Sequence, residues 1–123
     1  MLANWAHLPW ILGGDCNAVL DVSLDRSHPP LPGSPVVRVA AALVRWMEEW
    51  SLIDVWRQKN MRAKEYSFFS PPHQLHTRID RIICSTQTAL DTTHATYLAK
   101  TLLDHNPLEV RVQWGRPLAP IPT

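Results

Sequence analysis

The sequence has few cysteines, no long apolar run and almost no net charge, and each of these shortages argues against a class of protein. Two cysteines, Cys16 and Cys84, are too few for a disulfide framework. No apolar run approaches the roughly 20 residues that span a bilayer. Residues 1–12 lack the basic start and apolar core of a signal peptide. We therefore expect one intracellular domain, nuclear or cytoplasmic and not secreted, with no membrane as a partner.

The net charge of +1 does not by itself indicate a nucleic-acid ligand. A DNA contact must therefore be argued from a local cluster of basic residues. Such a cluster lies just before the aromatic residues of segment 66–69, and its members are Arg57, Lys59, Arg62 and Lys64. Basic and aromatic side chains in this order can contact phosphate and stack on a base. The alternative is a solvated loop that leads into a strand.

A short apolar run near the start of the chain ends in paired polar residues. Residues 9–12 are apolar, Gly13 and Gly14 end the run, and Asp15 and Asn17 follow two positions apart. The run predicts a buried strand, and the spacing puts both polar side chains on one face of an extended segment. Open α/β folds present sites at such strand ends. The alternative is an Asx turn in which the two residues cap local backbone groups.

Hydrophobic periodicity predicts five strands and one main helix. The strands are expected at about residues 9–14, 65–70, 78–84, 93–98 and 107–113, and the helix near 36–50. The proline-rich stretch 18–35 argues against regular structure between the first strand and the helix. The expected fold class is therefore α/β (α+β), with essentially one sheet and the helix on one of its faces.

Three polar clusters stand where a predicted strand meets a loop. They are Asp15 with Asn17, Arg78 with Asp80, and Asp104 with His105. Carboxylates hold a hard divalent cation or take a proton from water. A histidine held by an aspartate stabilises charge that develops on phosphorus. Metal-assisted hydrolysis of a phosphate ester requires these residue types. We therefore expect the clusters to converge at one edge of the sheet, with Asp80 and His105 within hydrogen-bonding reach.

This ordered set resembles the later half of the endonuclease/exonuclease/phosphatase superfamily, which carries a Gly-Asp-x-Asn segment, an Arg-Ile-Asp strand and a terminal Asp-His pair. The matching segments are 14–17, 78–80 and 104–105. A closer resemblance, to the endonuclease domain of vertebrate LINE-type (non-LTR) retrotransposons, lies in residues 24–27, 46–57 and 66–70. The resemblance covers roughly residues 9–112 and implies the C-terminal half of a two-sheet α/β sandwich.

The resemblance also implies a role for each residue of the set. Asp15 would orient or deprotonate the attacking water, and Asn17 would hold the phosphate. Asp80 would brace His105, which would contact the scissile phosphate. Asp104 would help to bind the divalent ion, normally Mg²⁺ with Mn²⁺ as an alternative.

The sequence departs from the family pattern at several positions. Cys16 stands where phenylalanine is usual, and Leu103 stands where a small hydroxyl residue precedes the Asp-His pair. Arg81 replaces a common tyrosine, so we expect a charge where an aromatic ring would pack.

The family's first half, with its metal-binding glutamate, has no counterpart in this sequence. We therefore expect residues 1–8 to end a missing N-terminal half, residues 9–114 to form the C-terminal half, and residues 115–123 to be a proline-rich tail. Without the partner sheet, the strands should expose a broad apolar face. The residues expected on that face are Ile11, Ile82, Val110 and Val112.

The expected function is Mg²⁺-dependent phosphodiester hydrolysis, as a DNA endonuclease that nicks target DNA for a retroelement. DNA is the expected partner, and an N-terminal half or the rest of a retroelement polyprotein is a further candidate. The candidate DNA contacts are Arg57, Lys59, Arg62, Lys64, Thr77 and Arg78. Because the glutamate half is missing, we expect the chain alone to be inactive. Two alternatives stay open: a non-catalytic, degenerate retroelement remnant, and a phosphatase or other phosphoesterase of the same superfamily.

Overall fold

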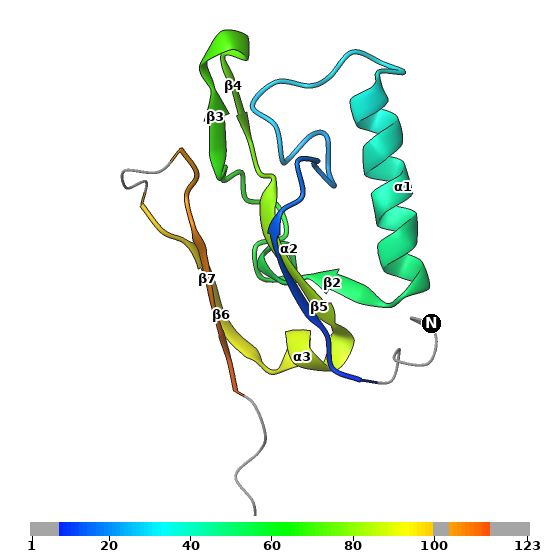
Figure 1. Cartoon of the computed structure of the whole chain (residues 1–123), viewed down its shortest axis with the longest axis vertical. Coiled ribbons are helices and arrows are strands. Elements are labelled where there is room, and N and C mark those ends of the chain that lie inside the picture. Colours follow the sequence, from blue (N-terminus) through cyan, green and yellow to red (C-terminus); the bar gives the residue numbers. More distant parts are fainter. Residues whose placement is uncertain (1–7, 100–103, 114–123) are drawn as a thin grey trace, which may run out of the picture.

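The computed structural model describes residues 8–99 and 104–113, in which short strands and helices follow one another (Figure 1). In chain order they are β1 (Ile11–Asp15), α1 (Pro35–Glu49), β2 (Leu52–Asp54), α2 (Val55–Lys59), β3 (Phe68–Ser70), η2 (Pro71–His73), β4 (Leu75–Thr77), β5 (Asp80–Ser85), α3 (Thr86–Leu90), β6 (Thr92–Tyr97) and β7 (Leu108–Val112). The expected mixed α/β fold class is confirmed. Within the described ranges, no helix has the length and apolar character needed to cross a bilayer.

Helix α1 confirms the predicted helix to within one residue at each end. Ser34 is extended at the N-cap, and Pro35 takes the first turn, where its fixed φ suits the helix and its missing N–H costs nothing. The apolar stripe of the helix buries Ala40 and Met47, while its charged residues are exposed. The helix therefore packs as an amphipathic element, and it contacts β2.

The central sheet has the strand order β1-β5-β2, and both pairings are antiparallel. The middle strand is β5, whose apolar residues Ile83 and Cys84 are buried. The register pairs Asp15 at the end of β1 with Asp80 at the start of β5. Two of the three polar clusters of the sequence therefore lie side by side on neighbouring strands.

Strand β1 is not the buried strand that its apolar residues predict. All five of its residues are exposed, and Ile11 and Leu12 keep 40% and 41% of their surface exposed. The strand lies at the edge of the sheet, and in the described part of the chain no further strand pairs with it. Side chains on an edge strand are buried only when another layer covers them, so an apolar run alone does not establish burial.

The strands form three separate hydrogen-bonded units, and the expected single sheet is wrong. Besides the central sheet, β3 pairs with β4 and β6 pairs with β7. The chain reverses between β3 and β4 through η2 and Gln74, whose φ of 48° is left-handed. Figure 1 shows the central sheet between α1 and the β6–β7 ladder, with the β3–β4 hairpin beyond one end.

The core packs where the β6–β7 ladder meets the central sheet. Its buried centre consists of Val55, Cys84 and Ala89. Ile82 of β5 and Val110 of β7 pack against this centre, which corrects the expected apolar face. Of the four residues expected there, only Ile11 is exposed, and the other three are half-buried.

We expect Leu12→Lys to reduce dye binding and self-association of the chain. Leu12 lies on an edge strand, where unpaired backbone groups and apolar surface favour association and a lysine opposes it. Fluorescence of a hydrophobic dye and sedimentation velocity measure the two effects. Leu31→Lys is the matched control, since Leu31 is 80% exposed and lies outside every strand. A native chain that is a monodisperse monomer and binds no dye would show this expectation to be wrong.

Candidate active site

Asp15, Asp80 and His105 meet at one end of the central sheet. The Nδ1 atom of His105 lies 2.6 Å from Oδ2 of Asp80, and its Nε2 atom lies 4.0 Å from Oδ2 of Asp15. One ligand-capable atom from each residue falls within 4.8 Å of the others. The predicted contact between Asp80 and His105 is therefore confirmed, although 25 positions separate the two residues.

Asp15 and Asn17 form the turn that ends β1. The Asn17 N–H donates to Oδ1 of Asp15 at 2.7 Å, and the Cys16 N–H donates to the Ile79 carbonyl at 2.9 Å. Asn17 has a left-handed φ of 48°, which asparagine tolerates better than most residues. The Asx-turn interpretation is thus correct, and it does not exclude a site, because the exposed Oδ2 side of Asp15 still faces His105.

His105 is held in place by the segment before and within β3. Its ring stacks on Phe68, with centroids 4.7 Å apart and planes at 29°, and the two residues form an isolated antiparallel bridge. Nε2, on the opposite side of the ring from the Asp80 contact, is the nitrogen nearer Asp15. The side chain is 34% exposed, so Nε2 can be reached by a ligand at the surface.

Asp104, the expected metal anchor, is exposed and does not belong to the cluster of ligand atoms. Within the cluster, Asp80 and His105 are bonded to each other through one oxygen and one nitrogen. Asp15 is the remaining carboxylate, and its side chain is 46% exposed. Its oxygen donors suit Mg²⁺, which usually binds one or two carboxylates together with water and substrate oxygens.

Arg78 is a structural residue, and its prediction as a DNA contact is wrong. Its side chain has no exposed surface. Its guanidinium donates to Oδ1 of Asp25 at 2.8 Å and to Oδ2 of Asp54 at 2.5 Å. A charge in a mostly apolar strand signals a buried partner, but the sequence does not indicate which carboxylates these are.

The buried ion pairs govern the protonation of both partners. Burial raises the pKa of Asp25, but hydrogen bonds and charge attraction from Arg78, with smaller help from the Asp21 backbone and Arg57, outweigh it and hold the pKa below 3.8. Burial likewise lowers the pKa of Arg78, and the bonds to Asp54 and Asp25 raise it above its ordinary value. Both groups are therefore charged at neutral pH.

The other expected DNA contacts divide into buried and exposed residues. Thr77 is buried. Arg57 binds Asp25 at 2.6 Å and also donates to two backbone carbonyls of the 60–63 loop. Lys59, Arg62 and Lys64 are exposed, so these three remain available to a ligand.

Arg81, which stands where the family usually has a tyrosine, is buried and does not expose its charge to solvent. The residue is 1% exposed, its Nη2 donates to the Arg78 carbonyl at 2.9 Å, and its Nε lies 3.8 Å from Oδ2 of Asp54. The arginine at this position thus joins the buried charges beneath the site.

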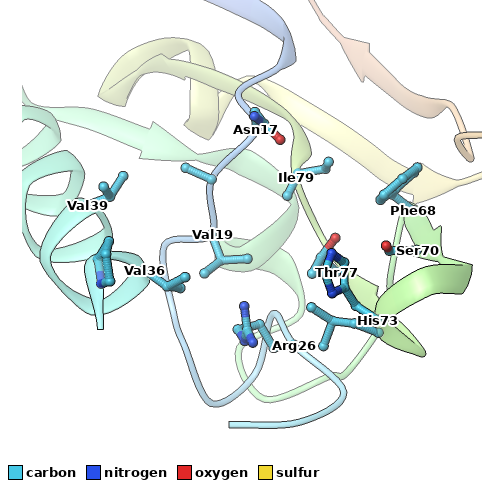
Figure 2. Close-up of a pocket in the computed structure, with 13 residues that line it drawn as sticks. Asn17, Val19, Arg26, Val36, Val39, Phe68, Ser70, His73, Thr77 and Ile79 are labelled. Atoms are coloured by element: carbon cyan, nitrogen blue, oxygen red, sulfur yellow. The ribbon is translucent and has the colours of Figure 1, made fainter. Parts of the chain in front are cut away.

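A pocket of about 430 Å³ adjoins the cluster (Figure 2). Asp80 and His105 line a separate cavity of about 330 Å³. Asn17 and Phe68 belong to the wall of the 430 Å³ pocket, which none of the three cluster residues lines. Most of its lining is apolar, and polar groups come from Arg26, Ser70, His73 and Thr77. An apolar pocket with a few polar groups is typical of a small-ligand site. Sequence reasoning missed it because its residues come from the 17–26 loop, α1 and the β3–β4 hairpin.

We expect Arg78→Met to destabilise the chain by about 3–5 kcal/mol, because it removes the charge shared by two buried carboxylates. Urea unfolding followed by circular dichroism measures the change. Arg111→Met is the matched control, since Arg111 pairs with Glu109 at the surface and is 70% exposed. Its loss should be about 0–1 kcal/mol. Equal losses for the two variants would disprove the structural role of Arg78.

The stability difference between the native chain and Asp25→Asn should shrink as the pH falls below about 4. The pKa of Asp25 is lowered in the folded chain, so its stabilisation is complete above the unfolded value and is lost as the carboxylate takes up a proton. Urea unfolding at a series of pH values measures the difference. Asp91→Asn is the control, because Asp91 is only half-buried and hydrogen-bonds Gln87. A difference for Asp25→Asn that stays constant down to pH 2 would count against this ion pair.

Comparisons with known proteins identify the fold. A scan against models of protein families finds no match. An AP endonuclease from Leishmania major, LMAP, aligns with a TM-score of 0.67 and 22% identity, over 81% of this chain and 34% of its own. The 3′-5′ exonuclease NExo from Neisseria meningitidis aligns with a TM-score of 0.70 and 20% identity, over 91% of this chain and 48% of its own. A Neisseria NExo variant is described as a 3′ phosphatase bound to a product DNA hairpin. It aligns with a TM-score of 0.68 and 18% identity, over 91% of this chain and 48% of its own.

The chain thus spans about a third to a half of the length of these solved structures. Identities of 18–22% show a shared fold and no more. This chain therefore has part of the endonuclease/exonuclease/phosphatase fold.

Proposed function

We propose that this chain carries part of a metal-dependent active site that hydrolyses phosphodiester bonds in DNA. The observation that supports it most is the 2.6 Å contact between Asp80 and His105, with Asp15 4.0 Å from the other ring nitrogen. Three separate segments bring these groups together at an exposed end of the sheet. A nucleophile-activating carboxylate beside a braced histidine is a suitable arrangement for attack on a phosphate ester.

Asp80 orients His105 in this proposal through the contact between its Oδ2 atom and Nδ1 of the ring. With a proton on Nδ1, His105 donates to Asp80, and its Nε2 points toward a bound phosphate. His105 then stabilises negative charge that builds up on the phosphate oxygens during attack.

Asp15 and Asn17 act on the water and the phosphate. The exposed oxygen of Asp15 orients or deprotonates the attacking water, and the Asn17 amide holds a phosphate oxygen. Asp15 is itself held by the Asn17 N–H, so the turn that ends β1 fixes both groups together. Misplacement of such groups by about 1 Å can cost a hundredfold in rate.

Asp15 would hold Mg²⁺, or Mn²⁺, and the ion would supply a positive charge that polarises the phosphate. The finer activity that we propose is nicking of target DNA for a LINE-type retroelement. That specificity rests on the sequence resemblance of the 24–27, 46–57 and 66–70 segments.

DNA as the substrate has two supports besides the site. One NExo structure of the same fold is described as bound to a product DNA hairpin. In this chain, exposed Lys59, Arg62 and Lys64 supply positive charge for a phosphate backbone. The pocket beside Asn17 and Phe68 offers room for the sugar or base next to the scissile phosphate.

A phosphatase is the second candidate, since the same NExo structure is described as a 3′ phosphatase. The Asp80–His105 pair would act on a terminal phosphate as well as on a bridging one. Release of phosphate from a 3′-phosphorylated oligonucleotide, measured beside nicking of a plasmid, separates the two activities.

We expect this chain alone not to cleave DNA. No glutamate joins the cluster in the described part of the chain, so Asp15 would hold the ion weakly and position it poorly. A supercoiled-plasmid nicking assay with Mg²⁺ tests the chain as given and the chain joined to a complete N-terminal half from a LINE-type relative. Only the joined protein should nick.

Two controls make this assay decisive. His105→Ala and Asp15→Ala in the joined protein should abolish nicking, as should removal of Mg²⁺ by a chelator. Robust nicking by the 123-residue chain itself would disprove its dependence on a second half. A folded joined protein that neither nicks nor releases phosphate would favour a non-catalytic remnant.

A further inference from the structure

Ser67 hydrogen-bonds both chain segments that carry the Asp80–His105 pair. It is 1% exposed and directly precedes β3. Its N–H donates to the Thr77 carbonyl at 2.9 Å, which extends the β3–β4 pairing by one bond. The backbone of Ser67 is therefore held by a hydrogen bond of its own, in addition to the contacts of its side chain.

The Ser67 hydroxyl holds the start of β5. Its Oγ accepts the N–H groups of Ile79 and Asp80, each at 3.1 Å. These two donors are the backbone groups just before and at Asp80. A hydroxyl oxygen can accept two hydrogen bonds, so one side chain fixes the backbone from which the Asp80 carboxylate projects.

The carbonyl of the same residue holds the segment that carries His105. The Asn106 N–H donates to it at 2.7 Å. On either side of Ser67, the Tyr66 carbonyl accepts from the Asn106 amide at 3.2 Å, and Phe68 stacks on the His105 ring. Segment 66–68 thus contacts residues 105 and 106 through two hydrogen bonds and one stacked ring pair.

We propose that Ser67 is a positioning residue that sets the distance between Asp80 and His105. In the described structure, no backbone hydrogen bond joins Asp80 to His105 directly. Ser67 is hydrogen-bonded to the backbone of Asp80 through its hydroxyl and to the backbone of Asn106, the residue after His105, through its carbonyl. Tyr97 also holds Asp80, donating to its carbonyl at 2.5 Å, but it has no hydrogen bond to the His105 segment in the described structure. The catalytic value of this spacing rests on the proposed function.

Nitrogen chemical shifts of His105 test the proposal without any need for catalysis. Long-range ¹H–¹⁵N spectra of the 123-residue chain at one fixed pH report the proton that Nδ1 shares with Asp80. Asp80→Asn supplies the shift for a His105 without the carboxylate, and His105→Gln assigns the signal. Thermal melting of each variant shows that it is folded.

Ser67→Ala should move the Nδ1 shift at least halfway from the native value to the Asp80→Asn value. Ser67→Thr keeps the hydroxyl and should restore the native shift. Thr88→Val is the matched control, because it removes another buried hydroxyl. Thr88 is 2% exposed, and its hydroxyl hydrogen-bonds the Ser85 hydroxyl and not the backbone at the start of β5. This control should leave the His105 shift at the native value, so a general loss of stability cannot imitate the effect.

Two results would overturn the proposal. One is a native Nδ1 shift in folded Ser67→Ala, and the other is an Asp80→Asn shift identical to that of the native chain. If Ser67→Ala does not fold, Ser67→Cys replaces it, since a thiol accepts hydrogen bonds only weakly. The same shift criterion applies. A failure of the nicking assay leaves these outcomes unchanged, because they measure the contact and not the reaction.

Discussion

One buried guanidinium joins the segments on which the site is built. Arg78 binds Asp25 from the loop after β1 and Asp54 from the end of β2, and its own carbonyl accepts from Arg81 in β5. Its side chain and that of Asp25 have no exposed surface. Charges taken out of water are tolerated only when they are paired with good geometry. The loop, β2 and β5 must therefore all be in place before Arg78 can be buried.

The same network reaches the site through Tyr97. Arg78 donates to the Tyr97 hydroxyl at 3.4 Å, and Tyr97 donates to the Asp80 carbonyl at 2.5 Å. Burial raises the pKa of Tyr97 to about 12, so the hydroxyl keeps its proton at neutral pH. Trp56 packs against Tyr97 at 5.3 Å between ring centroids and lies under the Arg78 guanidinium. The backbone of Asp80 is thus held by a buried hydroxyl, while its side chain is 19% exposed.

The sequence was more informative about the site than about the sheets around it. The polar pairs at strand ends predicted that all three pairs converge, because the chemistry restricts the residue types. Asp15, Asp80 and His105 do meet, whereas Asp104 lies outside the cluster. The exposure of β1 was not predictable from its apolar run, since its position at the edge of the sheet depends on how strands elsewhere in the chain pair. The partners of Arg78 lie 53 and 24 positions away, so no local pattern identifies them. Strands of three residues, such as β2 and β4, are too short for periodicity to reveal.

The central claim is that Asp15, Asp80 and His105 form one site for a phosphodiester and its metal ion. Substoichiometric Mn²⁺ added to the ¹⁵N-labelled chain tests it most directly, because the bound ion broadens the amide signals of nearby residues. The account predicts selective broadening at residues 15–17, 80 and 104–106, and its loss in Asp15→Asn. Exposed Glu48 and Glu49 on α1 serve as the internal reference. Equal broadening at α1 and at the site, or none at the site, would contradict the claim.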